Sequence, residues 1–251
     1  LTAAQVQKIL LYHTIGSKIA AADVPAGPNA KVITASGDSV FVTKNATGVY
    51  VNGIKVTTAN VSADNGVIHV IGKVLIPPAG NIVETAVASG LDSLVKAVTR
   101  ATTAPGGDPS LASTLSTARL TVFAPTNAAF TQLLAALSLS KIEDIPVATL
   151  LAVLRYHVVG GRAFSSDLSN SSLAMLAGGN TTVNLSNGTG GGPTITGNGN
   201  SGNKSNIIAT NIVCRNGVVH MINRILTVSY THLRDNETEA DIVCPLLHEK
   251  K

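Results

Sequence analysis

The stretch Arg155-Tyr156-His157-Val158-Val159-Gly160 decides the fold, because the chain contains it twice. Leu11-Tyr12-His13-Thr14-Ile15-Gly16 precedes it at an offset of 144 residues. A second pair follows: residues 216–221 (Asn-Gly-Val-Val-His-Met) repeat residues 65–70 (Asn-Gly-Val-Ile-His-Val) at an offset of 151. Self-similarity of this kind is typical of a chain built from copies of one structural unit. We therefore expect a tandem repeat.

The two copies differ in length. The larger offset of the second pair predicts an insertion in the later copy, and the Gly- and Asn-rich residues 187–192 and 197–203 are its loops. The later copy also extends about 70 residues upstream of its Tyr-His pair, where the earlier copy has eleven. We therefore expect the C-terminal part of a truncated domain at residues 1–79 and a complete domain at residues 80–227.

Each Tyr-His pair ends a segment with helical spacing. Thr2 and Gln5 are spaced as a capping box, and apolar residues then recur at i, i+3 and i+4 up to His13 or His157. Short runs rich in Val, Ile and Thr follow, and the Asn52-Gly53 pair between two of them predicts a hairpin. Helices followed by short strands indicate an α+β fold.

Composition excludes several classes of function. Only 13% of the 251 residues are charged, and the Lys and Arg residues before residue 228 are scattered singly. A nucleic-acid interface would need a basic stripe or patch. We therefore expect no nucleic-acid partner, and no apolar run is long enough to form a transmembrane segment.

Catalytic motifs are missing from the sequence. It has no Gly-x-Ser-x-Gly elbow, and the glycine-rich run after Asn187 lacks the Gly-Lys-Ser/Thr ending of a phosphate loop. Asp167 near Ser165 and Ser166 is interpreted as a polar loop, and Glu143-Asp144 as charges preceding a helix. We therefore expect a non-enzymatic protein without a cofactor.

Three boxes carry a family resemblance. Residues 121–130 (Thr-Val-Phe-Ala-Pro-Thr-Asn-Ala-Ala-Phe) resemble the first signature box of fasciclin domains. The Tyr-His segment and the box ending at His220 resemble the other two landmarks, in the same order and spacing. The resemblance covers residues 81–227 fully and 1–79 in part. It implies a wedge of short β-strands, similar to a β-sandwich, packed with α-helices.

The resemblance also implies a role. Family members are mostly secreted, surface-anchored or matrix-associated adhesion proteins, and in animal members the Tyr-His segment has been proposed to bind integrins. Carried over, this makes Tyr12, His13, Tyr156 and His157 candidate adhesion residues. We expect an extracellular glycoprotein that is secreted or anchored at the cell surface. Its partners would be cell-surface or matrix proteins or glycans, with self-association included.

The histidines have a second interpretation. His157 and His220 could be paired as metal ligands, but no nearby Cys, Asp or Glu completes the set of about four that structural zinc uses. We expect no metal and a buried neutral His157, hydrogen-bonded to Thr126 or Asn127, because an unpaired buried polar ring costs about 1–3 kcal/mol. His69 and His220 belong to the same structural set, and Cys214 is interpreted as a buried apolar residue.

Several further expectations concern the surface. Carbohydrate recognition by Asn, Ser and Thr side chains is the alternative function, as a polysaccharide- or small-ligand-binding extracellular domain.

Residues 228–251 hold eight of the chain's charged residues and resemble translated cloning or adaptor sequence, although a short native helix is the other interpretation. Before residue 228, Asn-x-Ser/Thr sequons make seven residues glycosylation candidates: Asn45, Asn60, Asn170, Asn180, Asn184, Asn187 and Asn203.

Overall fold

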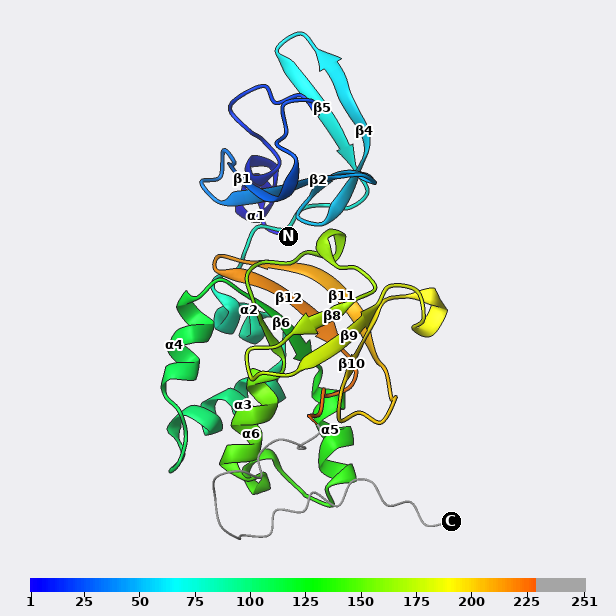
Figure 1. Ribbon diagram of the computed structural model, residues 1–251. Coiled ribbons are helices and arrows are strands. Elements are labelled where there is room, and N and C mark those ends of the chain that lie inside the picture. The colour runs from blue at the N-terminus through cyan, green and yellow to red at the C-terminus, as the bar shows by residue number, and fades with distance from the viewer. Residues whose placement is uncertain (229–251) are drawn as a thin grey trace.

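The computed structural model describes residues 1–228. The predicted non-native tail lies outside the described residues, apart from Val228. The described chain forms two units, each holding one copy of the repeat, and the first lies above the second in Figure 1. Each unit combines α-helical structure with its own sheet of short strands, so the predicted α+β fold is confirmed.

The first unit is a helix beside a five-stranded antiparallel sheet in the order β1-β2-β3-β4-β5. Its helix begins at the predicted capping box, in which the Thr2 side chain and the Gln5 backbone are bonded. The β4–β5 hairpin projects away from the second unit (Figure 1). The elements are α1 (Ala3–Tyr12), β1 (Gly27–Ile33), β2 (Ser39–Asn45), β3 (Gly48–Val51), β4 (Ile54–Ala63) and β5 (Gly66–Ile71).

The second unit adds a layer of helices to a seven-stranded sheet in the order β7-β6-β12-β11-β10-β9-β8. Its helices are α2 (Ile82–Ala88), α3 (Asp92–Thr103), α4 (Ser110–Thr117), α5 (Asn127–Ala136) and α6 (Val147–Arg155). Its strands are β6 (Leu120–Pro125), β7 (Val158–Gly160), β8 (Ser172–Ala174), β9 (Asn180–Asn184), β10 (Thr194–Gly197), β11 (Ser205–Cys214) and β12 (Gly217–Ile222).

Local sequence signals account for the element boundaries. Asn52 and Gly53 both have positive φ between β3 and β4, as a tight hairpin turn requires. Gly90, with a φ of +68°, separates α2 from α3, because glycine adopts this conformation without a steric cost. Pro146 directly precedes α6, where its fixed φ suits a helix start.

Strand β6 is the centre of the second unit. All six of its residues are buried, and it pairs in parallel with β12 from Leu120 opposite Gly217 to Pro125 opposite Ile222. A Cβ atom added to Gly217 would lie 2.1 Å from the Leu120 carbonyl oxygen, so only glycine fits here. The main core lies between this sheet and the helices.

In the first unit as the structure describes it, no layer of helices covers the equivalent face of the sheet. Within residues 1–228, that unit has no counterpart of β6 or of α2–α5. Leu10 of α1 is 62% exposed, whereas its counterpart Leu154 is buried. Ile68 of β5 is 54% exposed, whereas its counterpart Val219 is buried. The helical layer therefore accounts for the difference in burial between the two copies.

An aromatic contact joins the two units. Phe41 of β2 packs against Phe164, with ring centroids 6.1 Å apart, and both belong to a cluster with Val213 and Val218. The Arg162 guanidinium carbon lies 3.8 Å from the centroid of the Phe41 ring, in cation–π geometry. Burial of these large rings stabilises the pairing of the copies.

Hydrogen bonds surround that contact. The Asn29 side-chain amide donates to the Arg162 carbonyl at 2.7 Å, and the Thr43 hydroxyl donates to the Asp167 carboxylate at 3.1 Å. A Cβ atom at Gly53 would lie 2.5 Å from the Asn211 side chain, so the β3–β4 turn fits closely against β11. The first unit is therefore held to the second by an apolar contact with a polar rim.

Candidate functional site

The imidazole of His157 follows α6 and lies inside the second unit, 2% exposed. Its Nδ1 lies 2.7 Å from the Val153 carbonyl oxygen, and its Nε2 lies 2.9 Å from the Leu226 backbone nitrogen. Because a carbonyl only accepts and an amide N–H only donates, the ring is neutral with its proton on Nδ1. Burial lowers the pKa of His157 to about 4, against a weaker opposing contribution from the Val153 carbonyl.

The neighbouring Tyr156 is also fully buried. Its hydroxyl donates to the Asn180 carbonyl at 2.5 Å and accepts from the Asn198 N–H at 3.1 Å. Burial raises the pKa of the Tyr156 phenol, and the hydrogen bond from Asn198 opposes that shift. The Tyr-His pair thus ties the end of α6 to β9, to the loop after β10 and to the segment after β12.

The first unit repeats this network with the same atoms. His13 Nδ1 lies 2.8 Å from the Ile9 carbonyl oxygen, and the Leu75 N–H donates to its Nε2 at 2.9 Å. The Tyr12 hydroxyl donates to the Ser39 carbonyl at 3.0 Å. Tyr12 is buried, whereas His13 is exposed.

The second histidine of each copy joins the strands to the loop after the Tyr-His segment. His220 Nε2 lies 2.9 Å from the Ala163 carbonyl oxygen, and His69 Nε2 lies 2.8 Å from that of Ile19. The His220 ring stacks on Phe123 with centroids 5.5 Å apart. Burial lowers the pKa of His220, while the Ala163 carbonyl and the Asp167 charge oppose the shift.

The predicted side-chain partners of His157 require a correction. Thr126 instead caps α5 by accepting from the Ala129 N–H at 3.3 Å. Asn127 is exposed, and its amide bonds to the backbone of Gly90 and Ser93, both at 2.9 Å. The prediction was wrong because backbone groups beside the ring already satisfy both of its nitrogens.

The burial of the two Tyr-His pairs bears on their predicted role in adhesion. Tyr12, Tyr156 and His157 are buried, so only His13 of the four presents its ring to solvent. Their assignment to adhesion stays a prediction.

The described residues contain no group of three or more His, Cys, Asp or Glu side chains that could hold a metal ion. Asp167, considered above with Ser165 and Ser166, accepts from the Phe164 N–H at 2.9 Å and from the Thr43 hydroxyl. That carboxylate therefore shapes its loop. Cys214 is 1% exposed, as expected, and burial raises the pKa of its thiol.

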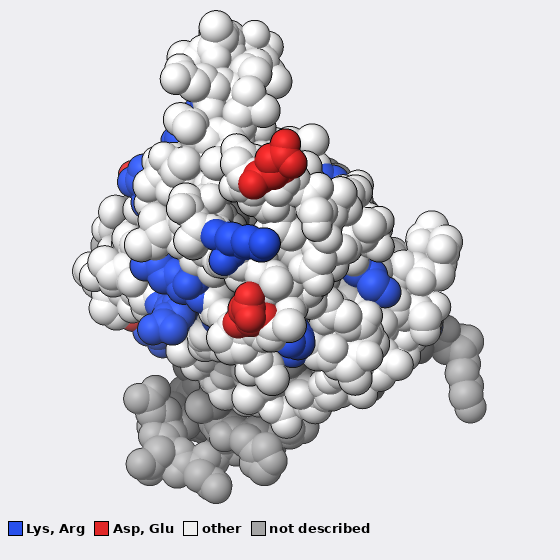
Figure 2. Space-filling view, turned by 90° about the horizontal axis from the view of Figure 1, so that it is seen from above, with Lys and Arg blue, Asp and Glu red and all other residues white. Residues whose placement is uncertain are grey.

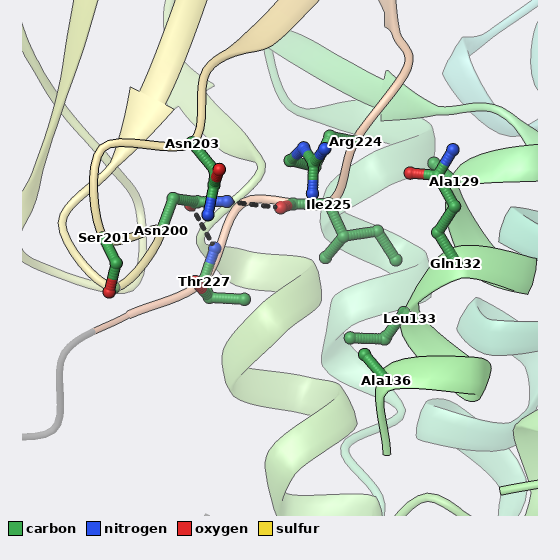
Figure 3. A pocket seen from close by; sticks show the side chains of 11 residues that line it. Ala129, Gln132, Leu133, Ala136, Asn200, Ser201, Asn203, Arg224, Ile225 and Thr227 are labelled. Atoms are coloured by element: carbon green, nitrogen blue, oxygen red, sulfur yellow. Dashed lines mark hydrogen bonds between the residues drawn. The ribbon is translucent and has the colours of Figure 1, made fainter. Parts of the chain in front are cut away.

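One small pocket lies between α5 and the loop after β10, with a volume of about 230 Å³. Arg224 lies between that loop, which carries Asn203, and the helix that carries Gln132 and Leu133 (Figure 3). Asn200 is fixed by its bonds to the Ile225 carbonyl and the Thr227 N–H, the dashed lines in Figure 3. A guanidinium and amides over an apolar floor suit a small polar or anionic group.

A larger cleft of about 710 Å³ lies where the two units meet. The β3–β4 hairpin, the linker after β5, the end of α2 and part of β11 form its walls. Neither the small pocket nor this cleft has a local sequence signature, because each combines segments far apart in the chain.

Charged side chains are spread thinly over the first unit. Figure 2, which views the molecule from above, shows more basic than acidic side chains and a surface that is mostly uncharged. Among the described residues, no helix is long and apolar enough to cross a bilayer.

The sequons gather on the strand side of the second unit. Asn170, Asn180, Asn184 and Asn187 lie on or beside β8 and β9, and Asn203 lies in the loop after β10. Asn45 and Asn60 belong to the first unit, where the side-chain amide oxygen (Oδ1) of Asn60 accepts from the Ala21 N–H at 2.9 Å. Six of the seven are exposed, and Asn184 is half-buried. Glycosylation of any of them stays a prediction.

Comparison with known families decides the assignment. A model of the fasciclin domain matches residues 1–77 and 94–228. The chain belongs to the fasciclin family. Fasciclin domains as a family are adhesion-type extracellular or cell-surface modules and are typically non-enzymatic. The two matched segments correspond to the two units, while the boundary between residues 79 and 80 stays a prediction.

The similar proteins include one from a cyanobacterium and one solved structure from an insect. "Protein sll1483" of Synechocystis sp. is 42% identical over 71 residues, which are 28% of this chain and 38% of that protein. The chain therefore matches less than half the length of this relative. A solved FAS1 domain pair from the insect cell adhesion molecule Fasciclin I is 18% identical, with a TM-score of 0.48 over 89% of this chain and 80% of that one.

Proposed function

We propose that this fasciclin-family chain is a non-enzymatic cell-adhesion or extracellular-matrix interaction protein. The family match across both copies carries the proposal. On this proposal the protein acts outside the cell, secreted or surface-anchored, and binds cell-surface or matrix proteins or glycans. Two copies in fixed contact offer a broad surface, and tandem binding raises affinity through effective concentration.

The environment of the polar groups supports a binding role over catalysis. The imidazoles of His157 and His220 both bond to backbone groups inside the second unit. A general base needs a free nitrogen within hydrogen-bond reach of its substrate. Neither ring offers one.

An attachment assay tests the adhesion proposal. Surfaces coated with the full chain are compared with surfaces coated with Phe41→Ala/Arg162→Ala, which loosens the contact between the copies. We expect attachment of cells above a blocked surface for the full chain, and reduced attachment for the variant. Attachment equal to the blocked surface for the folded full chain would contradict the proposal.

The second candidate is a polysaccharide- or small-ligand-binding domain, which the 230 Å³ pocket favours. Arg224 and Gln132 are among its polar residues, and Leu133 and Ile225 form part of its apolar floor. On a glycan array, this candidate requires saturable binding to one glycan that Arg224→Ala abolishes. Binding that Arg224→Ala leaves intact would exclude this pocket.

A further inference from the structure

The cleft between the two copies combines surfaces that neither copy has alone. Its volume of about 710 Å³ is within the range of ligand sites, which occur preferentially at such boundaries. Lys55 and Thr57 of β4 and Lys73 of the linker line it from the first unit. Ser89 at the end of α2 and Thr210 of β11 line it from the second.

The charge of the cleft has one sign. Lys55 and Lys73 are its ionisable residues, since no Asp, Glu or His lines it. In the described part of the chain, neither ammonium group has a carboxylate within 4.0 Å. Both side chains are exposed and free to turn toward a ligand. A cleft with walls of one sign concentrates ligands of the opposite charge.

The remaining polar groups are hydroxyls and amides. Across residues 1–228, the hydroxyls of Ser89 and Thr210 make no hydrogen bond to another protein group, whereas the Thr57 hydroxyl donates to the Val70 carbonyl at 3.2 Å. Apolar side chains, among them Ile54 and Ile212, also line the cleft. The cleft thus presents cations, unpaired hydroxyls and apolar patches to one ligand.

We propose that this cleft binds an acidic oligosaccharide that carries carboxylate groups, such as a chain of uronic acids. Its carboxylates pair with Lys55 and Lys73, its hydroxyls bond to Ser89 and Thr210, and its C–H faces cover the apolar patches. A fatty acid would satisfy the ammonium groups but leave the hydroxyls without partners, which is unfavourable in a closed contact. A neutral sugar would leave both lysines unused.

The inference rests on the proposed extracellular role and gives it one ligand class. Each exposed ion pair strengthens binding only about 1.4- to 5-fold, so one site binds weakly and depends on salt. Firm attachment would need several sites on the same polymer.

The experiment titrates the full chain with digalacturonate by NMR, with cellobiose as the neutral probe. We expect saturable binding of digalacturonate, with shifts at the amides of Ser89 and Thr210. We expect Lys55→Ala/Lys73→Ala to weaken it about 2- to 30-fold, because two exposed charge-assisted contacts are lost. Raising the salt concentration weakens it as well, and cellobiose binds less tightly.

The matched control is Lys31→Ala/Lys96→Ala, which removes the same charge from two exposed lysines outside the cleft. This control retains binding if the cleft is the site. Equal loss in both double variants would show general charge attraction and overturn the proposal, as would the absence of saturable binding. Neither result bears on cell attachment, so the adhesion proposal is tested separately.

Discussion

The backbone N–H of Leu226 donates to Nε2 of His157 at 2.9 Å, across 69 residues of sequence. This bond fastens the segment that leaves the sheet to the end of α6. It requires an imidazole without a proton on Nε2, because a protonated ring would place two donors against each other. In this chain the Tyr-His segment is therefore a structural brace, by which we mean that it links the end of α6 to the segment after β12.

The protonation state of that ring predicts a pH dependence. The pKa of His157 is about 4 in the folded protein and near its ordinary value of about 6.5 in the unfolded chain. A lowered pKa means stability that is complete above pH 6.5 and is lost as the pH falls toward 4. We expect this histidine to lower the free energy of unfolding by about 3 kcal/mol over that interval.

Urea denaturation at pH 7.5 and pH 4.5 measures the effect, with His157→Gln as the comparison. The variant removes the titrating group, so its stability should change less between the two pH values. His220, whose pKa burial also lowers, retains its contribution in both proteins. Equal pH dependence in the two proteins would contradict the assignment to His157.

The two copies provide a matched pair of histidines. We expect His157→Ala to lower the free energy of unfolding by about 2–3 kcal/mol, because it leaves the buried Leu226 N–H without a partner. His13→Ala removes the equivalent bonds at an exposed residue of the first unit and should cost less than about 1 kcal/mol. Thermal and urea unfolding of the full chain compare the two variants, and a larger loss for His13→Ala would count against the brace.

Gly217 and Gly66 form a second matched pair. An added Cβ would strike the Leu120 carbonyl at the first position and meet nothing within 4 Å at the second. We expect Gly217→Ala to cost about 2 kcal/mol or more by forcing β12 from β6, and Gly66→Ala to stay within about 0.5 kcal/mol of the parent. Circular dichroism melts measure both. Similar melts for the two variants would contradict the tight parallel pairing.

Removal of the Phe41 ring should weaken the contact between the two copies. Phe41→Ala removes a buried aromatic side chain, a change that typically costs about 3–5 kcal/mol. We expect faster amide hydrogen exchange in β1 and β2 and little change in α6. Ile33→Ala, at a position 64% exposed, is the control and should leave exchange unchanged. Unaltered exchange in Phe41→Ala would show that the ring does not hold the first unit in place.

The Asn52-Gly53 hairpin and the capping box at Thr2 could be predicted from sequence, because each depends on residues that are neighbours in the chain. The repeat could be predicted because the sequence itself recurs. Helix α4 was missed, since its eight mostly small and polar residues bury only Leu111 and Leu115. The parallel pairing of β6 with β12 was also outside local prediction, because it joins residues about 100 positions apart.

Prediction of the site failed at one step for a physical reason. A ring that bonds to backbone groups leaves no pattern of partner side chains in the sequence. The hydrogen-bond partners of His157 were therefore predicted from residue type alone, as Thr126 and Asn127. The contact between Phe41 and Phe164 has no local pattern either. Sequence identified the histidines, and only the three-dimensional arrangement identified what they bond to.

The most direct test of the brace is the ¹⁵N NMR spectrum of the His157 imidazole in the full chain, recorded from pH 5 to 8 with and without Zn²⁺. We expect a neutral His157 ring that is protonated on Nδ1 throughout this pH range and is unchanged by the metal. A ring that becomes charged near pH 6.5, or whose nitrogens shift on adding Zn²⁺, would contradict it.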